Sequence, residues 1–189
     1  MLLVLDKPGT IVPKTYADLA AIPDDGVQYE LIAGEIIMVP PPTTYQQDIS
    51  GFLYSTLDSI VRTRRLGKVY FSPVNVYAKK HEVYQPDILF IRRENLAILE
   101  MDGVHGAPDF VIEILSPSNA YYDLRHKKDI YEHIGVREYW IVDPMEHSIE
   151  CFLNSEKGFE TSFIGKGNGR TCSATVPEFC VEVADVFEL

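Results

Sequence analysis

The sequence has little cysteine. Its three cysteines, Cys151, Cys172 and Cys180, form no CxxC pair and leave an odd thiol over. This spacing argues against a disulfide framework and against a structural zinc site, because both need matched sets of cysteines. We therefore expect free thiols and a protein of the reducing cytoplasm.

Long apolar runs are also missing. No stretch of 18 apolar residues occurs, so we expect no transmembrane helix and no membrane partner. The start of the chain, Met1 to Asp6, is too short for the apolar segment of a signal peptide, and no basic segment precedes it.

Several catalytic motifs are absent. The sequence has no glycine-rich phosphate loop, no GxSxG and no HExxH. Its five histidines have no metal-ligand spacing: His81, His105, His126, His133 and His147. Kinase, serine hydrolase and zinc protease functions therefore lack support.

Positive charge is scarce. The chain has 17 Lys and Arg against 28 Asp and Glu, a net charge of −11. This charge counts against a simple nucleic-acid binder, because phosphate contacts need local positive charge. The basic residues are concentrated, however, in two groups: Arg62, Arg64, Arg65 and Lys68, then Lys79, Lys80, Arg92 and Arg93. They could form a local basic rim, or they could be a solvated helix end and a loop.

Periodicity predicts a mixed sheet flanked by helices. Alternating residues predict two strands, 29–32 and 35–39, joined by a tight hairpin. An apolar stripe predicts a helix over about 45–66, with Gly67 as its C-cap. A second long helix is expected over about 120–134. Further strands are expected over 68–78, 84–91, 110–115, 138–144, 149–153 and 159–163, the last two as a hairpin.

Two carboxylates are set into these apolar strands. Asp87 follows a proline at a strand start, and Glu113 interrupts an apolar run that is typical of a strand buried on both faces. An ionised carboxylate there is costly unless it is paired or binds a metal. If the strands are neighbours, Asp87 and Glu113 could hold one hard cation. The alternatives are an arginine partner for Glu113 and a turn or capping role for Asp109.

A lysine stands on the apolar face of the second helix. At about 100° per residue, Lys127 falls between Ile130 and Tyr131 on the helical wheel, whereas Lys128 falls to one side. Lys127 is therefore predicted to point inward, near the end of the carboxylate strand. The alternative is a lysine whose stem runs along the surface to solvent.

Three further residues could reach the same cleft. Tyr45 and Gln46 begin the long helix beside its apolar stripe, and for Tyr45 a packing role is preferred. Glu30, in the first hairpin, could be a third acidic ligand, although exposed hairpin glutamates are ordinary.

Four segments, in this order, resemble the Uma2 family of restriction endonuclease-like proteins, which is abundant in cyanobacteria and has the PD-(D/E)XK nuclease fold. They are residues 29–35, 85–87, 108–118 and 135–144. The likeness extends from about residue 16 to the C-terminus. It implies an α/β (α+β) fold with a restriction endonuclease-like core, an N-terminal and a C-terminal β-hairpin, and a single domain of about 16–189 after an arm of 1–15.

The resemblance also implies a site. It places Asp87, Glu113 and the Ile114 carbonyl as ligands of Mg²⁺, with Mn²⁺ as a substitute. The usual lysine position, two residues after the glutamate, is Leu115 here, and the family places its lysine on the next helix, at Lys127.

One position departs from the family. Tyr45 stands where the family often has histidine, while Gln46 keeps the glutamine that follows it. This departure leaves Gln46 as a second-tier member of the predicted site. Glu30, the possible third acidic ligand, is the other second-tier member.

The sequence thus predicts a Mg²⁺-dependent DNA endonuclease of the cytoplasm, acting as a homodimer. One alternative is a catalytically silent module that keeps the fold and binds nucleic acid or protein. Another is a nuclease that cuts RNA or branched DNA.

Overall fold

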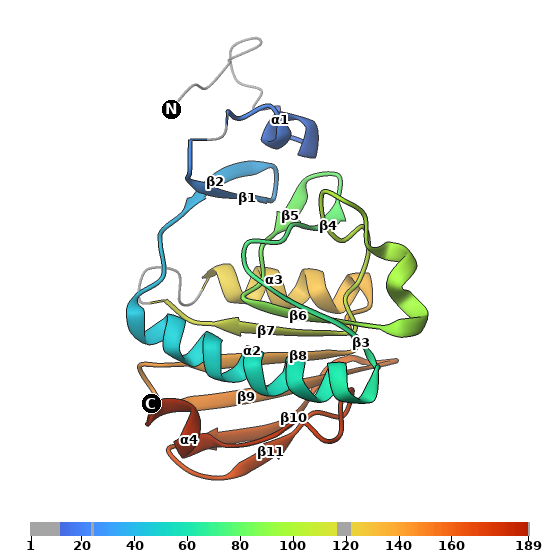
Figure 1. Ribbon diagram of the computed structural model, residues 1–189. Coiled ribbons are helices and arrows are strands. Elements are labelled where there is room, and N and C mark those ends of the chain that lie inside the picture. Colours follow the sequence, from blue (N-terminus) through green and yellow to red (C-terminus); the bar gives the residue numbers. More distant parts are fainter. Residues whose placement is uncertain (1–11, 24, 117–121, 189) are drawn as a thin grey trace.

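The computed structural model describes residues 12–23, 25–116 and 122–188. Two sheets form its framework, and Figure 1 shows the smaller sheet above the larger one, with α3 between them. The large sheet has the order β10-β9-β8-β7-β6-β3, in which only β7 and β8 pair in parallel. Its strands are β3 (Gly67–Phe71), β6 (Ile88–Arg92), β7 (Phe110–Ile114), β8 (Glu138–Asp143), β9 (Ser148–Ser155) and β10 (Gly158–Lys166).

The small sheet is antiparallel, with the order β2-β1-β5-β4. Its strands are β1 (Gln28–Ile32), β2 (Glu35–Val39), β4 (Val76–Lys79) and β5 (Glu82–Tyr84). A third pair is formed by β11 (Arg170–Cys172) and β12 (Cys180–Glu182). The helices are α1 (Tyr16–Ala20), α2 (Thr44–Arg64), the 3₁₀ helix η1 (Arg93–Ile98), α3 (Tyr122–Ile134) and α4 (Val183–Phe187).

Each face of the large sheet is covered by a different helix. Ile49 and Leu53 of α2 pack with Phe90 of β6 in one buried cluster. Ile130 and Tyr131 of α3 pack in a second cluster on the opposite face. This arrangement confirms the predicted mixed sheet flanked by helices. Among the described residues, no helix is both long and apolar enough to span a membrane.

The end of α2 differs from the prediction. Thr43 caps the helix start by accepting the Gln46 N–H, and the helix ends at Arg64, followed by the C-cap Arg65 in a left-handed conformation with φ 56°. Gly67 is therefore not the C-cap. It begins β3, where a Cβ atom would lie 2.0 Å from the Ile91 carbonyl oxygen, so the close approach of β3 to β6 requires glycine.

Two predicted strands are each divided between the two sheets. The segment predicted as 68–78 forms β3 and β4, and the one predicted as 84–91 forms β5 and β6. Pro73 and Pro86 lie in the two breaks. Proline cannot donate to a strand ladder, so these positions let the chain leave one sheet and join the other.

The expectation of free thiols is wrong for two cysteines. Cys172 and Cys180 stand opposite each other in the β11–β12 pair and form a disulfide. The pairing depends on strand register, which brings together residues eight positions apart without a CxxC spacing. Cys151 is buried and free.

Candidate active site

The register of β6 and β7 brings the two predicted metal ligands together. Ile88 pairs with Ile112 in this antiparallel ladder. Asp87, one residue earlier, therefore stands opposite Glu113, one residue later. The predicted neighbourhood of the two strands is confirmed, and both carboxylates line one cleft.

Asp87 is held by the backbone of β7. It is half-buried, and its Oδ2 accepts the Ile114 N–H at 2.7 Å. Burial raises the pKa of the Asp87 carboxyl to about 6, although this hydrogen bond and the charge of Lys127 oppose the rise. Residues in a strand direct their N–H and C=O toward the same edge, so the Ile114 carbonyl faces the side on which Asp87 lies.

Glu113 is held from two sides inside the cleft. Its side chain is buried, its Oε1 accepts the Tyr131 hydroxyl at 3.0 Å, and its Oε2 lies 3.7 Å from the Lys127 Nζ. Burial raises the pKa of the Glu113 carboxyl to about 8, and the charge of Asp87 adds to the rise. Tyr131 was not predicted here. Its position one helical turn after Lys127 was the available signal.

Lys127 points into the cleft, as its place on the helical wheel predicted. It is only 8% exposed, and its Nζ donates to the Glu30 Oε1 at 2.9 Å. Lys128 instead lies over the Phe152 ring at 3.5 Å. Glu30 is also fixed from a second side by the Gln85 N–H, at 2.8 Å.

A second polar contact joins α3 to the small sheet. The Nε2 of His126, next to Lys127 on the helix, lies 3.1 Å from the Oε1 of Glu82 in β5. Glu82 also accepts the Tyr84 hydroxyl and the Ala33 N–H. The small sheet thus anchors the helix that carries the lysine.

Gln46 lines the cleft but does not contact the carboxylates by hydrogen bond. Its Nε2 donates to the Leu115 carbonyl at 3.0 Å, and its Oε1 accepts the Thr43 N–H at 2.8 Å. Gln46 therefore ties the end of β7 to the start of α2. The Tyr45 hydroxyl donates to the Phe187 carbonyl at 2.9 Å and its ring packs on the core, which is the preferred packing role.

The cleft has a volume of about 250 Å³. Among the described residues that line it, Glu30, Asp87 and Glu113 carry carboxylates and Lys127 carries the one ammonium. Three acids face one base in the cleft, and the charges of neighbouring acids add to the burial that raises the pKa values of Asp87 and Glu113. Oxygen donors of this kind suit a hard divalent cation, so the residues present fit Mg²⁺ or Mn²⁺.

A different acidic group lies on the surface. Glu100, Asp102 and His105 bring possible ligand atoms within 4.8 Å of one another in the loop after η1. Glu100 and Asp102 are exposed, and Asp102 already pairs with the His105 Nε2 at 2.9 Å. This solvated turn lacks the enclosure of the cleft.

Asp109 lies at the other end of β7 and has a capping role. It is buried, its carboxylate accepts the Arg92 N–H and the Asn95 amide, both at 2.8 Å, and the Arg137 Nε lies 3.4 Å away. The interpretation of Asp109 as a structural residue is consistent with these contacts.

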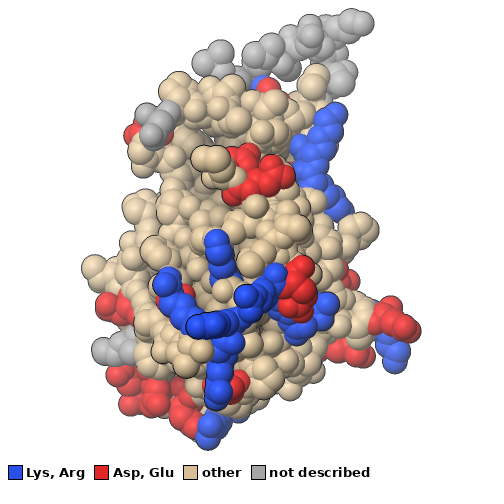
Figure 2. All heavy atoms as spheres, turned by 45° about the vertical axis from the view of Figure 1, so that its right-hand side comes forward, with Lys and Arg blue, Asp and Glu red and all other residues tan. Residues whose placement is uncertain are grey.

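Basic residues gather at this same end of the sheet. Figure 2 shows Lys and Arg side chains massed on one face, which lies on the right-hand side of Figure 1. The α2 terminus, the start of β3 and the end of β6 meet there, since the Arg93 N–H donates to the Leu66 carbonyl and Gly67 pairs with Arg92. We call this the basic surface: Arg62, Arg64, Arg65, Lys68, Arg92, Arg93 and Arg137. It lies at the opposite end of β6 from Asp87, so these residues do not rim the carboxylates.

Comparisons with known proteins identify the family. The Uma2 family model, described as "Putative restriction endonuclease", matches residues 14–184. The chain is similar to a solved structure of "a putative nuclease belonging to DUF820 from Anabaena variabilis ATCC 29413", with 21% identity, a TM-score of 0.78, and coverage of 93% of this chain and 98% of that one. A search among curated proteins found no match. Because the family model spans most of its length, the chain belongs to the Uma2 family of restriction endonuclease-like proteins.

Proposed function

We propose that this protein is a Mg²⁺-dependent endonuclease that hydrolyses phosphodiester bonds in DNA. Its family and its nuclease-like fold support a nuclease. The observation that carries the proposal is the charge imbalance of the cleft, where three acids face one lysine. With all three acids ionised the cleft carries two surplus negative charges, which a divalent cation would offset.

Asp87, Glu113 and the Ile114 carbonyl are the residues that would hold the cation. When bound, it supplies Lewis-acid stabilisation of the negative charge that develops on the phosphate oxygens. The Ile114 N–H already fixes the Asp87 carboxylate, and the Tyr131 hydroxyl fixes that of Glu113. Both ligands are thus oriented before any cation arrives, which lowers the cost of binding it.

Lys127 is the proposed partner of the reacting groups. Its ammonium, 3.7 Å from Glu113, can orient the attacking water or neutralise the scissile phosphate. Glu30 acts through Lys127, because their contact at 2.9 Å holds the lysine side chain in place in the cleft. Gln46 contributes indirectly: it donates to the Leu115 carbonyl, which directly follows Glu113 and Ile114 in β7, and so fixes the backbone that carries these two ligands.

The DNA partner, the homodimer and the cytoplasmic location belong to the same proposal. Phosphates need positive charge, and the basic surface provides it away from the cleft. Free thiols were the reason to expect a reducing cytoplasm, and the disulfide removes that reason. The proposed cytoplasmic location therefore rests only on the proposed nucleic-acid substrate. Light scattering of the purified protein tests the homodimer.

Cleavage of plasmid and oligonucleotide DNA with Mg²⁺, Mn²⁺ or EDTA tests the proposal. We expect cleavage with either metal, none in EDTA, and none for Asp87→Asn or Glu113→Gln. Asp102→Asn is the matched control, because it removes an acid from the exposed group and should leave the rate unchanged. Cleavage that survives both cleft variants would refute the assignment. Metal-independent binding without cleavage would favour the silent module.

A further inference from the structure

An aromatic side chain stands exposed at the mouth of the cleft. Phe71, the last residue of β3, lines the cleft and is 55% exposed. Its ring meets the Tyr54 ring of α2 edge to face, with centroids 4.7 Å apart. The next residue, Ser72, donates its N–H to the Asp87 carbonyl at 3.0 Å. An exposed aromatic ring therefore lies close to the backbone that carries a predicted metal ligand.

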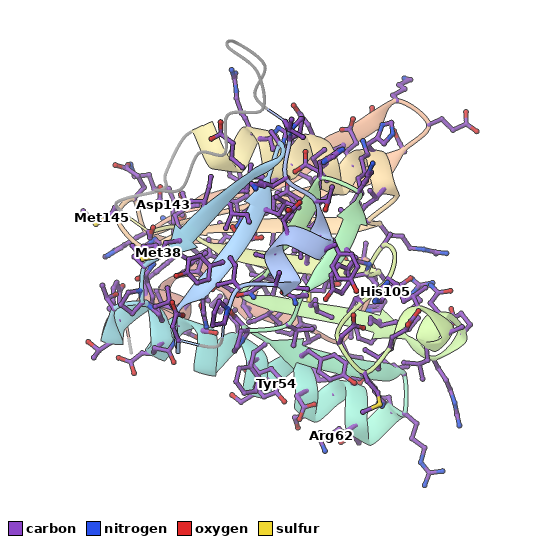
Figure 3. All side chains as sticks on the ribbon, turned by 90° about the horizontal axis from the view of Figure 1, so that it is seen from above. Met38, Tyr54, Arg62, His105, Asp143 and Met145 are labelled. Atoms are coloured by element: carbon purple, nitrogen blue, oxygen red, sulfur yellow. A yellow bond between two sulfur atoms is a disulfide. The ribbon has the colours of Figure 1, made fainter. Side chains whose placement is uncertain are left out.

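The long helix leads from this ring pair to the basic surface. Tyr54 and Arg62 lie eight residues apart on α2, and Figure 3 shows both side chains along that helix. Eight residues correspond to about 12 Å of helix. At the spacing of about 3.4 Å per nucleotide of a stacked strand, this path accommodates roughly four nucleotides.

The basic surface keeps a local excess of positive charge. Its seven cations have four carboxylate partners, Asp58, Glu94, Asp109 and Glu178, which leaves a local charge of +3 on a protein of net charge −11. Arg65, Lys68 and Arg93 are exposed and have no ion pair with any residue that the structure describes. Such a surface attracts phosphates, which the acidic remainder repels.

We propose that the cleft takes a single strand of nucleic acid, with an unpaired base stacked on Phe71 and the strand continuing along α2 to the basic surface. This inference rests on the proposed function and names its substrate class: nucleic acid that is unpaired where it is cut. Proteins that bind single strands combine stacking aromatics with a basic path for the backbone. In a continuous duplex the bases stack on one another, and none is free to cover Phe71.

The first test is binding of fluorescein-labelled oligothymidylate, measured by anisotropy with Ca²⁺ in place of Mg²⁺. Stacking on one aromatic ring is worth about 1–3 kcal/mol, so Phe71→Ala should weaken binding at least about fivefold. Phe71→Leu should weaken it similarly, because leucine keeps apolar area but no ring, and Phe71→Trp should restore it. A blunt duplex of two complementary strands of equal length should bind more weakly and be insensitive to Phe71.

The second test varies strand length. The triple variant Arg65→Gln, Lys68→Gln, Arg93→Gln should leave binding of a four-nucleotide strand unchanged and weaken that of a twelve-nucleotide strand. For the twelve-nucleotide strand, the magnitude of the slope of log binding constant against log salt concentration should be smaller by about 2 in the triple variant, since each lost phosphate contact removes about 0.7. The matched control removes three exposed lysines elsewhere, as Lys79→Gln, Lys80→Gln, Lys157→Gln.

Duplex binding as tight as single-strand binding, or a neutral Phe71→Ala in protein with native circular dichroism, would overturn the inference. Equal losses in the triple variant and its control would overturn the path along α2. These results are separate from cleavage. A protein that binds single strands through Phe71 yet cuts nothing would refute the proposed nuclease, and one that cuts duplex DNA independently of Phe71 would refute only this inference.

Discussion

Glu113→Gln should stabilise the metal-free protein at alkaline pH. The substitution keeps the shape of the side chain and an oxygen that can accept the Tyr131 hydroxyl, but it removes a buried charge. In the wild-type protein the pKa of Glu113 is raised from 4.5 to about 8, chiefly by burial. The folded state therefore holds this proton more tightly than the unfolded chain does.

The sign and size of the effect follow from that difference. The stability that the proton contributes is fully present below about pH 4.5 and is lost as pH rises through about 8. One pKa unit corresponds to about 1.4 kcal/mol, so the loss is on the order of several kcal/mol. The free energy of unfolding of the wild type should fall across this window, and that of Glu113→Gln should fall much less.

Urea unfolding in EDTA at pH 5.5, 7 and 8.5 measures this difference. Adding Mg²⁺ at about 100 times its dissociation constant should then stabilise the wild type by about 2.7 kcal/mol and leave the variant unchanged. Glu100→Gln, in an exposed position, is the control and should follow the wild type. Parallel pH profiles for the wild type and Glu113→Gln would refute the reasoning, because they would mean that Lys127 already compensates the buried charge.

Three further variants test separate parts of the structure. Lys127→Met should lower the cleavage rate about 100-fold or more while metal binding, measured by calorimetry, remains, because the lysine is proposed to act on the reacting groups and not on the cation. Asp109→Ala should cost about 3 kcal/mol in urea unfolding, since it leaves buried donors without their acceptor, and an unchanged midpoint would contradict its capping role. Joint Cys172→Ser and Cys180→Ser should cost about 2–3 kcal/mol of stability in oxidising buffer by the loop-entropy relation and nothing in dithiothreitol, with cleavage unaffected in both.

Much of the site followed from periodicity. Glu113 stood out because a strand buried on both faces has no place for an unpaired carboxylate, and Lys127 stood out because the helical period put it among apolar neighbours. Both arguments use the direction of one side chain relative to its own element. Such arguments succeed when the environment of the side chain is decided by the face of the strand or helix on which it lies.

Other parts depended on how distant segments meet. Glu30 was predicted only as a second-tier member, since hairpin glutamates are usually exposed and its burial arises only when the hairpin docks on α3. The basic residues near 62–68 and 92–93 were clustered in sequence, but strand register places them at the far end of β6 from the acids. The Cys172–Cys180 pair likewise depended on register and not on spacing.

The position of Lys127 on α3 also affects when the cleft is completed during synthesis and folding of the chain. The residues of the cleft occur in the order Glu30, Asp87, Glu113, Lys127, so the ammonium is the last of these groups to be synthesised. Its position depends on the small sheet, through Glu30 and the neighbouring His126–Glu82 contact. A nascent or truncated chain can therefore display the acids without the base. The assembled cleft exists only once three layers have packed, which couples any activity of the cleft to completed folding.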